Sequence, residues 1–105
     1  MYIYNVTINI DEGIHEKWLS WMNTEHIPAM LATGKFSKAL LTQVIVEGDM
    51  EGKTYSVQYT TENKETLEKY FTENAAELRA HSKHFEGRFV AFRTELQVVA
   101  EHLST

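Results

Sequence analysis

Alternation of apolar and polar residues marks two of the four strands that this chain is expected to contain. Residues 2–10, YIYNVTINI, place apolar side chains on one face and mostly polar side chains on the other. Residues 53–61, KTYSVQYTT, alternate in the same way, and a period of two residues is that of a β-strand. Residues 38–47, KALLTQVIVE, are rich in branched apolar side chains, and residues 88–99 complete the predicted set. A hairpin loop is expected at 47–52.

A helical period of apolar residues over positions 13–33 predicts the first helix, capped by Asp11. Its apolar face carries Ile14, Trp18, Trp21 and Met22. Pro28 lies inside this segment and has no N–H to donate to the carbonyl of Thr24. We therefore expect the first part to end near Glu25–His26 and Ile27 to leave helical angles. Pro28 would then open a short second turn.

A second helix is predicted over residues 62–85, with Asn63 or Thr61 as its cap and Gly87 at its end. The order of elements is then strand, helix, strand, strand, helix, strand. This is the split βαβ pattern of a ferredoxin-like α+β fold, with a four-stranded antiparallel sheet and both helices on one face. Right-handed crossovers place the first and third strands at the centre. We expect residues 1–105 to form one domain.

The sheet face opposite the helices is expected to meet a second copy of the chain. On the central strands this face is polar but almost uncharged, with Asn5, Thr7, Asn9, Ser56 and Gln58. On the outer strands the pattern does not decide which alternate residues face the core. The apolar candidates for the open face there are Leu41, Ile45, Val90, Phe92 and Leu96. An apolar margin around an uncharged centre is typical of two sheets packed face to face. We predict a homodimer through this face; the alternative is a monomer with an open polar face.

Composition excludes several classes of function. Ten basic residues stand against 15 acidic ones, and no basic stripe is present, which argues against nucleic acid as a partner. The chain has no Cys, so disulfides and thiolate chemistry are excluded. No segment has the pattern of a signal peptide or a membrane span. A cytoplasmic location without a membrane partner is the default expectation.

Length, element order and the run from Trp18 to Pro28 resemble the dimeric α+β barrel superfamily. That superfamily includes antibiotic-biosynthesis-type monooxygenases, EthD-like proteins, stress-responsive barrel proteins and haem-degrading monooxygenases. His26-x-Pro28 looks most like the EthD-like branch. The stretches WLSWMNTEHIPAMLATGKF and HFEGRFVAFRTEL look closer still to a family of short bacterial proteins of unknown function. The resemblance implies a homodimer with a cleft between each sheet and its helices or partner, and it implies no single reaction.

His26 is the candidate catalytic residue, because imidazole titrates near neutral pH and suits acid–base chemistry. We hypothesise that Pro28 aims His26 toward a small pocket lined by Trp18, Trp21 or Met22. The alternative is a histidine at a helix C-terminus whose positive charge is favoured by the helix dipole.

His81 and His84 lie three residues apart, a spacing that can seat a metal, with Glu77 one turn before them. Cations at a helix end are the alternative, and neither a metal site nor a cofactor is assigned. The resemblance to the haem-degrading branch implies a first-strand Asn and a second-helix His, which Asn5 and His81 or His84 match. The Trp expected in that branch has no counterpart.

Three further residues are candidates for ligand binding: Asn5, Gln58 and Arg93. Arg93 lies inside the last strand, where it either binds an anionic ligand or pairs with Glu95 or another acid. The tyrosines at positions 2, 4, 55 and 59 share one parity, which core packing explains without a ligand.

Two functions from different classes fit these observations. One is a protein with a small-molecule pocket in each subunit, either a binding protein or a cofactor-independent monooxygenase-like or EthD-like enzyme. The other is a dimer with a purely structural or interaction role. No Gly-rich phosphate loop, Ser nucleophile motif or catalytic carboxylate pair is present to choose an enzyme class.

Overall fold

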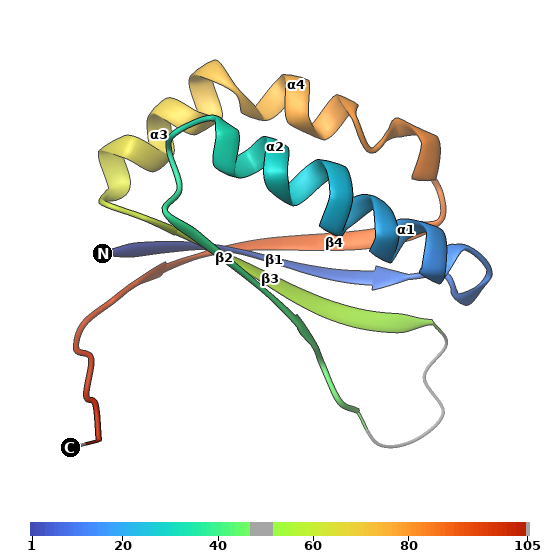
Figure 1. The fold of residues 1–105 in the computed structure, drawn as a ribbon, viewed down its shortest axis with the longest axis horizontal. Helices are drawn as coiled ribbons and strands as arrows, with labels where there is room; N and C mark the ends of the chain where they lie inside the picture. Colours follow the sequence, from blue (N-terminus) through green and yellow to red (C-terminus); the bar gives the residue numbers. More distant parts are fainter. Residues whose placement is uncertain (47–51, 105) are drawn as a thin grey trace.

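The structure, a computed structural model, describes residues 1–46 and 52–104. Its centre is formed by β1 (Tyr2–Ile10) and β3 (Lys53–Thr61), whose bounds are those predicted from the alternation. β2 (Lys38–Gln43) and β4 (Phe89–Gln97) flank them, so the strand order is β2-β3-β1-β4. Every pair is antiparallel, and both helical segments cover one face of the sheet (Figure 1). The predicted α+β ferredoxin-like fold is confirmed.

β2 is shorter than expected: it ends at Gln43, and residues 44–46 lie beyond the strand. Apart from Gly52, the predicted hairpin loop lies outside the described residues. None of the helices over residues 1–46 and 52–104 has the length and apolar character needed to cross a lipid bilayer.

The first helical segment does not break at His26, contrary to prediction. It runs through η1 (Glu12–Ile14), capped by Asp11, α1 (His15–Trp21), the π-helical η2 (Met22–His26) and α2 (Ile27–Ala32). Ile27 stays helical, with φ −61° and ψ −46°, and its N–H donates to the carbonyl of Met22, five residues back. The wider hydrogen-bond spacing of the π turn accommodates the missing N–H of Pro28 within a continuous helix.

The second helical segment is interrupted once, where a single helix was predicted. It consists of α3 (Lys64–Glu73), α4 (Ala75–Ala80) and η3 (Lys83–Phe85). Asn63 is the cap, since its side chain accepts a hydrogen bond from the N–H of Thr66. At the interruption, Asn74 has left helical angles and its side-chain oxygen accepts a hydrogen bond from Lys35. A helix-ending glycine with positive φ follows, as expected, at Gly87.

The core lies between the helices and the sheet, and strand register assigns every other strand residue to it. Leu41 pairs with the fully buried Val57 and packs against the core. The prediction that Leu41 is a candidate for the open face is therefore wrong. Ile45 lies beyond the end of β2. The tyrosines at positions 4, 55 and 59 are buried in the core, as the sequence predicted, whereas Tyr2 is only partly buried.

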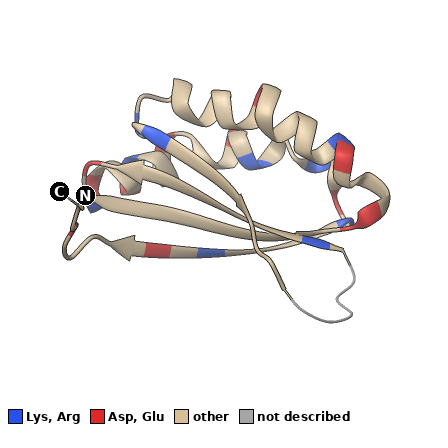
Figure 2. Ribbon diagram, turned by 60° about the horizontal axis from the view of Figure 1, so that its bottom comes forward, with Lys and Arg blue, Asp and Glu red and all other residues tan. Residues whose placement is uncertain are grey.

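The open face of the sheet has the polar centre and apolar margin that the sequence predicted. In the centre, the Ser56 hydroxyl donates to Asn5, whose amide donates to Thr7. Val90, Phe92 and Leu96 of β4 share this face by register, and Leu40 of β2 joins them on the opposite edge. Charged residues are sparse along the strands, and β1 carries none (Figure 2).

Candidate functional site

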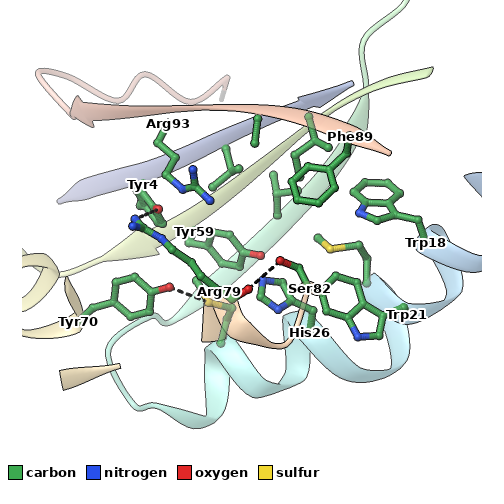
Figure 3. A pocket seen from close by; sticks show the side chains of 16 residues that line it. Tyr4, Trp18, Trp21, His26, Tyr59, Tyr70, Arg79, Ser82, Phe89 and Arg93 are labelled. Carbon is green, nitrogen blue, oxygen red and sulfur yellow. Dashed lines mark hydrogen bonds between the residues drawn. The ribbon is translucent and has the colours of Figure 1, made fainter. Parts of the chain in front are cut away.

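A cavity of about 60 Å³ lies between the sheet and the helices (Figure 3). A single water needs roughly 10–15 Å³, and a 150 Å³ cavity is known to bind benzene. The cavity is therefore too small for a ring-sized ligand as it stands, and such a ligand requires its wall to move. Met22 and Met30 line the wall and have the flexible side chains that such a movement uses.

One end of the cavity is apolar and aromatic. Trp18 and Trp21 come from α1 and Phe89 from the start of β4, with Met22 beside them. Both tryptophans and Met22 are buried. The helical spacing that the sequence shows places these three side chains on the inward face of the segment. An aromatic or aliphatic group of a ligand fits this end.

His26 occupies the inner wall of the cavity and stacks on Trp21, with ring centroids 4.7 Å apart and planes 20° apart. In an α-helix, residues five apart point about 140° away from each other. The π turn brings them onto one side of the helix, so the widened segment before Pro28 is what creates the stack. A π turn takes the place of the predicted break, and the hypothesis that Pro28 aims His26 stays a prediction.

The Nδ1 atom of His26 is buried and has no hydrogen-bond partner among the residues that the structure describes. Burial, and secondarily the charge of His81, lower the pKa of His26 to about 4. The imidazole is therefore neutral at neutral pH. This lowered pKa argues against a histidine cation favoured by a helix dipole, and the helical segment also continues past His26 into α2.

On its outer side His26 borders a surface groove with Trp21, Glu25, His81 and His84. The stacked pair of Trp21 and His26 therefore separates the interior cavity from this groove. The described part of the chain contains no group of three side chains able to hold a metal.

The other end of the cavity is polar and carries two guanidinium groups. Arg79 of α4 donates a hydrogen bond from Nη2 to the Tyr4 hydroxyl at 3.2 Å, and Arg93 extends from β4 toward the same region (Figure 3). The hydroxyl of Tyr70 donates to Sδ of Met30 at 3.3 Å. Burial raises the pKa of Tyr70 to about 12, so this hydroxyl remains neutral.

The alternative in which Arg93 pairs with Glu95 is wrong. Neither Arg79 nor Arg93 forms a salt bridge over residues 1–46 and 52–104. Glu95 instead accepts a hydrogen bond from the Tyr2 hydroxyl at 3.2 Å.

Five predicted site residues meet at the cavity: Trp18, Trp21, Met22, His26 and Arg93. The other two, Asn5 and Gln58, lie opposite each other on the open face of the sheet. Since the helices cover the other face, the chain does not bring Asn5 together with His81 or His84, and the match to the haem-degrading pattern is not assembled within one subunit. The binding roles of all seven residues stay predictions.

Sequence reasoning missed Arg79, which lines the cavity although its side chain is largely exposed. A signal was present, because Arg79 follows the buried Ala75 by four residues and precedes Ser82 by three. This spacing puts it on the edge of the inward face of the helix. Tyr4 and Tyr59 were assigned to the core, where they are, but they also line the cavity.

Solved structures share this fold at low sequence identity. A dimeric ferredoxin-like protein from an uncultured marine organism is 16% identical, with a TM-score of 0.69 over 99% of this chain and 100% of that one. An ethyl tert-butyl ether D (EthD) family protein from Bacillus halodurans is 12% identical, with a TM-score of 0.65 over 92% and 100%. A mutant of MhuD with two manganese protoporphyrin IX molecules bound per active site is 19% identical, with a TM-score of 0.68 over 99% and 100%. These similarities establish the fold.

Sequence comparison places most of the chain in one family model. The model is described as a domain of unknown function, DUF4286, and it matches residues 1–99. The search of curated proteins gives no match. The expected resemblance to a family of unknown function within the ferredoxin-like fold is confirmed.

Proposed function

This chain belongs to the DUF4286 family, and on that premise we propose that the protein is a homodimer that binds a small organic molecule in the cavity of each subunit. The observation that carries the proposal is the buried Nδ1 of His26, which has no partner in the described residues. Leaving a buried polar atom unsatisfied costs about 1–3 kcal/mol. A ligand that supplies the missing hydrogen bond removes this cost.

A hydroxyl group is the ligand group that suits His26 best. With the ring proton on Nε2, Nδ1 accepts a hydrogen bond; with the proton on Nδ1, it donates one. A hydroxyl can do either, and Trp21 holds the imidazole plane in place by stacking. The aromatic end of the cavity, with Trp18 and Phe89, then covers the apolar part of the ligand.

Binding is favoured over acid–base catalysis by the protonation of His26. A general base is most effective when its pKa lies near the working pH. The pKa of His26 is lowered to about 4, which makes the imidazole a weak base. A cofactor-independent monooxygenase-like or EthD-like activity is therefore the second candidate, and it would require the ligand itself to raise this pKa.

The homodimer is supported by the exposed apolar margin of the open sheet face. Phe92 is 66% exposed and Val90 58% exposed on an edge strand, which is a large apolar area to leave in water. The similar structure from an uncultured marine organism is described as dimeric.

Phenol and toluene test the site, because they share a shape and differ in one hydroxyl. Trp18 and Trp21 line the cavity, so their fluorescence reports binding. We expect phenol to bind more tightly than toluene, and His26→Phe to remove this preference while keeping the aromatic stack. His102→Phe, in the exposed C-terminal segment, is the matched control and should bind like the wild type.

Native mass spectrometry of the purified protein provides the independent measurement. A small molecule retained by the wild type and lost from His26→Phe supports the proposal. Absence of any retained molecule, together with no fluorescence change on adding phenol, contradicts it.

A further inference from the structure

We propose that the cavity selects carboxylic acids, with the carboxylate held between Arg79 and Arg93 at the mouth and the apolar part of the ligand inside. This inference rests on the proposed binding function and adds the chemical class of the ligand. It is carried by two guanidinium groups that line one end of a mostly apolar cavity and form no salt bridge with the described residues.

The two arginines reach the cavity from different elements. Arg79 belongs to α4 in the helical layer, and Arg93 belongs to β4 at the edge of the sheet. Both line the cavity, and both lower the pKa of the same Tyr70 hydroxyl through their charge, although burial of that hydroxyl dominates. Both side chains are largely exposed, so the polar end is the mouth of the cavity. Figure 3 shows Trp18 and Phe89 on the opposite side.

Neither guanidinium forms a salt bridge within the part of the chain that the structure describes. The chain has 15 acidic residues against 10 basic ones, so carboxylates are plentiful. The salt bridges found there involve Lys35, Lys53 and Arg88. Arg79 donates instead to the neutral hydroxyl of Tyr4. In an acidic protein, two unpaired arginines that meet at a cavity leave a positive charge for a ligand to balance.

A carboxylate matches this mouth better than other anions. A guanidinium presents a planar fork of donors that suits both carboxylates and phosphates. The cavity behind the mouth is mostly apolar, which favours a singly charged group on an apolar body, and the wall at Met22 and Met30 must move to admit a ring. The ligand class is therefore a small aromatic or branched carboxylic acid, its ring directed toward Trp18 and Phe89.

Benzoate and benzyl alcohol are the matched probes, and binding is followed by tryptophan fluorescence and calorimetry. On the wild type we expect benzoate to bind at least about tenfold more tightly than benzyl alcohol, as a charge-assisted hydrogen bond predicts. Arg79→Gln and Arg93→Gln should each reduce this preference several-fold, mainly through weaker binding of benzoate. Arg88→Gln is the control, because Arg88 pairs with Asp11 away from this cavity, and it should keep the wild-type preference.

Arg93→Lys keeps the charge and should retain part of the preference, so it separates loss of charge from loss of structure. Equal binding of benzoate and benzyl alcohol to the wild type would overturn the carboxylate assignment and leave the proposed binding function standing. Tighter binding of phenyl phosphate than of benzoate would overturn it in favour of a phosphate monoester. If neither benzoate nor benzyl alcohol binds but phenol does, the carboxylate assignment fails and the proposed function stands. If phenol also gives no fluorescence change and no molecule is retained in native mass spectrometry, both fail.

Discussion

At the scale of single residues, hydration decides the chemistry of this site. His26 was selected from the sequence because imidazole titrates near neutral pH, yet its surroundings remove that property. Burial takes the ring out of water and leaves Nδ1 without a partner in the described residues. The sequence indicated the residue and its aromatic neighbours, but the depth of burial depends on the sheet and the second helical segment, which lie far away in the chain.

The lowered pKa of His26 makes the stability of the fold depend on pH. The pKa is about 4 in the folded chain against 6.5 for a free histidine, so the unfolded chain binds this proton more readily. The contribution of His26 to the free energy of unfolding is therefore fully present above pH 6.5. It is lost as the pH drops toward 4, by up to about 3 kcal/mol. Urea unfolding at pH 7.5, 5.5 and 4.5 measures the loss.

His26→Phe should show a smaller loss than the wild type over the same range. The comparison is needed because Glu25, His81 and His84 border the same groove and also carry ionisable side chains. Identical pH dependence in both proteins would show that His26 is not the buried, neutral group described above.

Two glycines form a matched pair that separates backbone strain from steric clash. Gly34 and Gly52 have nearly the same positive φ, 76° and 78°. A Cβ at Gly34 would meet nothing within 4 Å, whereas one at Gly52 would lie 2.6 Å from the carbonyl oxygen of Ile10. Gly34→Ala should cost about 1–2 kcal/mol, the strain of the left-handed conformation alone. Gly52→Ala should lower the free energy of unfolding, measured in urea, by clearly more than Gly34→Ala does. An equal loss in the two variants would contradict the predicted steric clash.

At the scale of elements, regular patterns were predictable and irregular ones were not. Alternation gave β1 and β3 their observed bounds, because one face of each is buried. The parity of β2 was open, since Leu40 and Leu41 are both apolar and only pairing with β3 assigns Leu41 to the core. Pro28 indicates that the helix is irregular near this position. Whether a proline breaks a helix or is accommodated by a π turn depends on tertiary packing.

Pro28→Ala tests whether the π turn positions His26. Alanine restores the N–H, which can donate to the carbonyl of Thr24 and return the segment to α-helical spacing. His26 would then rotate away from Trp21, and its pKa should rise from about 4 toward 6.5. We expect stability to change by no more than about 1 kcal/mol, because Pro28 is at the exposed start of α2.

An NMR titration of the His26 ring gives the pKa directly. Thr24→Ala is the control, since it removes only a side-chain hydrogen bond to the Ser20 carbonyl and leaves the proline in place. A pKa that stays near 4 in Pro28→Ala would mean that the sheet and the second helical segment, and not the π turn, hold His26 in the cavity.

At the scale of the whole molecule, the two faces of the sheet have separate roles. The face toward the helices supplies the core and the cavity, whereas the open face carries a hydrogen-bonded polar centre with few charges. Asn5 and Gln58 belong to this second face, which is why they do not join the cavity residues. If two open faces meet in a dimer, these residues are buried between the sheets, and each subunit keeps its own cavity on the helix side.

Phe92→Lys tests the dimer where the apolar margin is most exposed. The wild type should scatter light as twice the 12.2 kDa of one chain at micromolar concentration. A lysine at position 92, or at Gln58, would be buried without a partner and should shift the protein to monomers, since an uncompensated buried charge costs several kcal/mol. Leu31→Lys, on α2, is the control and should stay dimeric. A monomeric wild type would show that this face does not pair with a second copy of the chain and would contradict the proposed dimer.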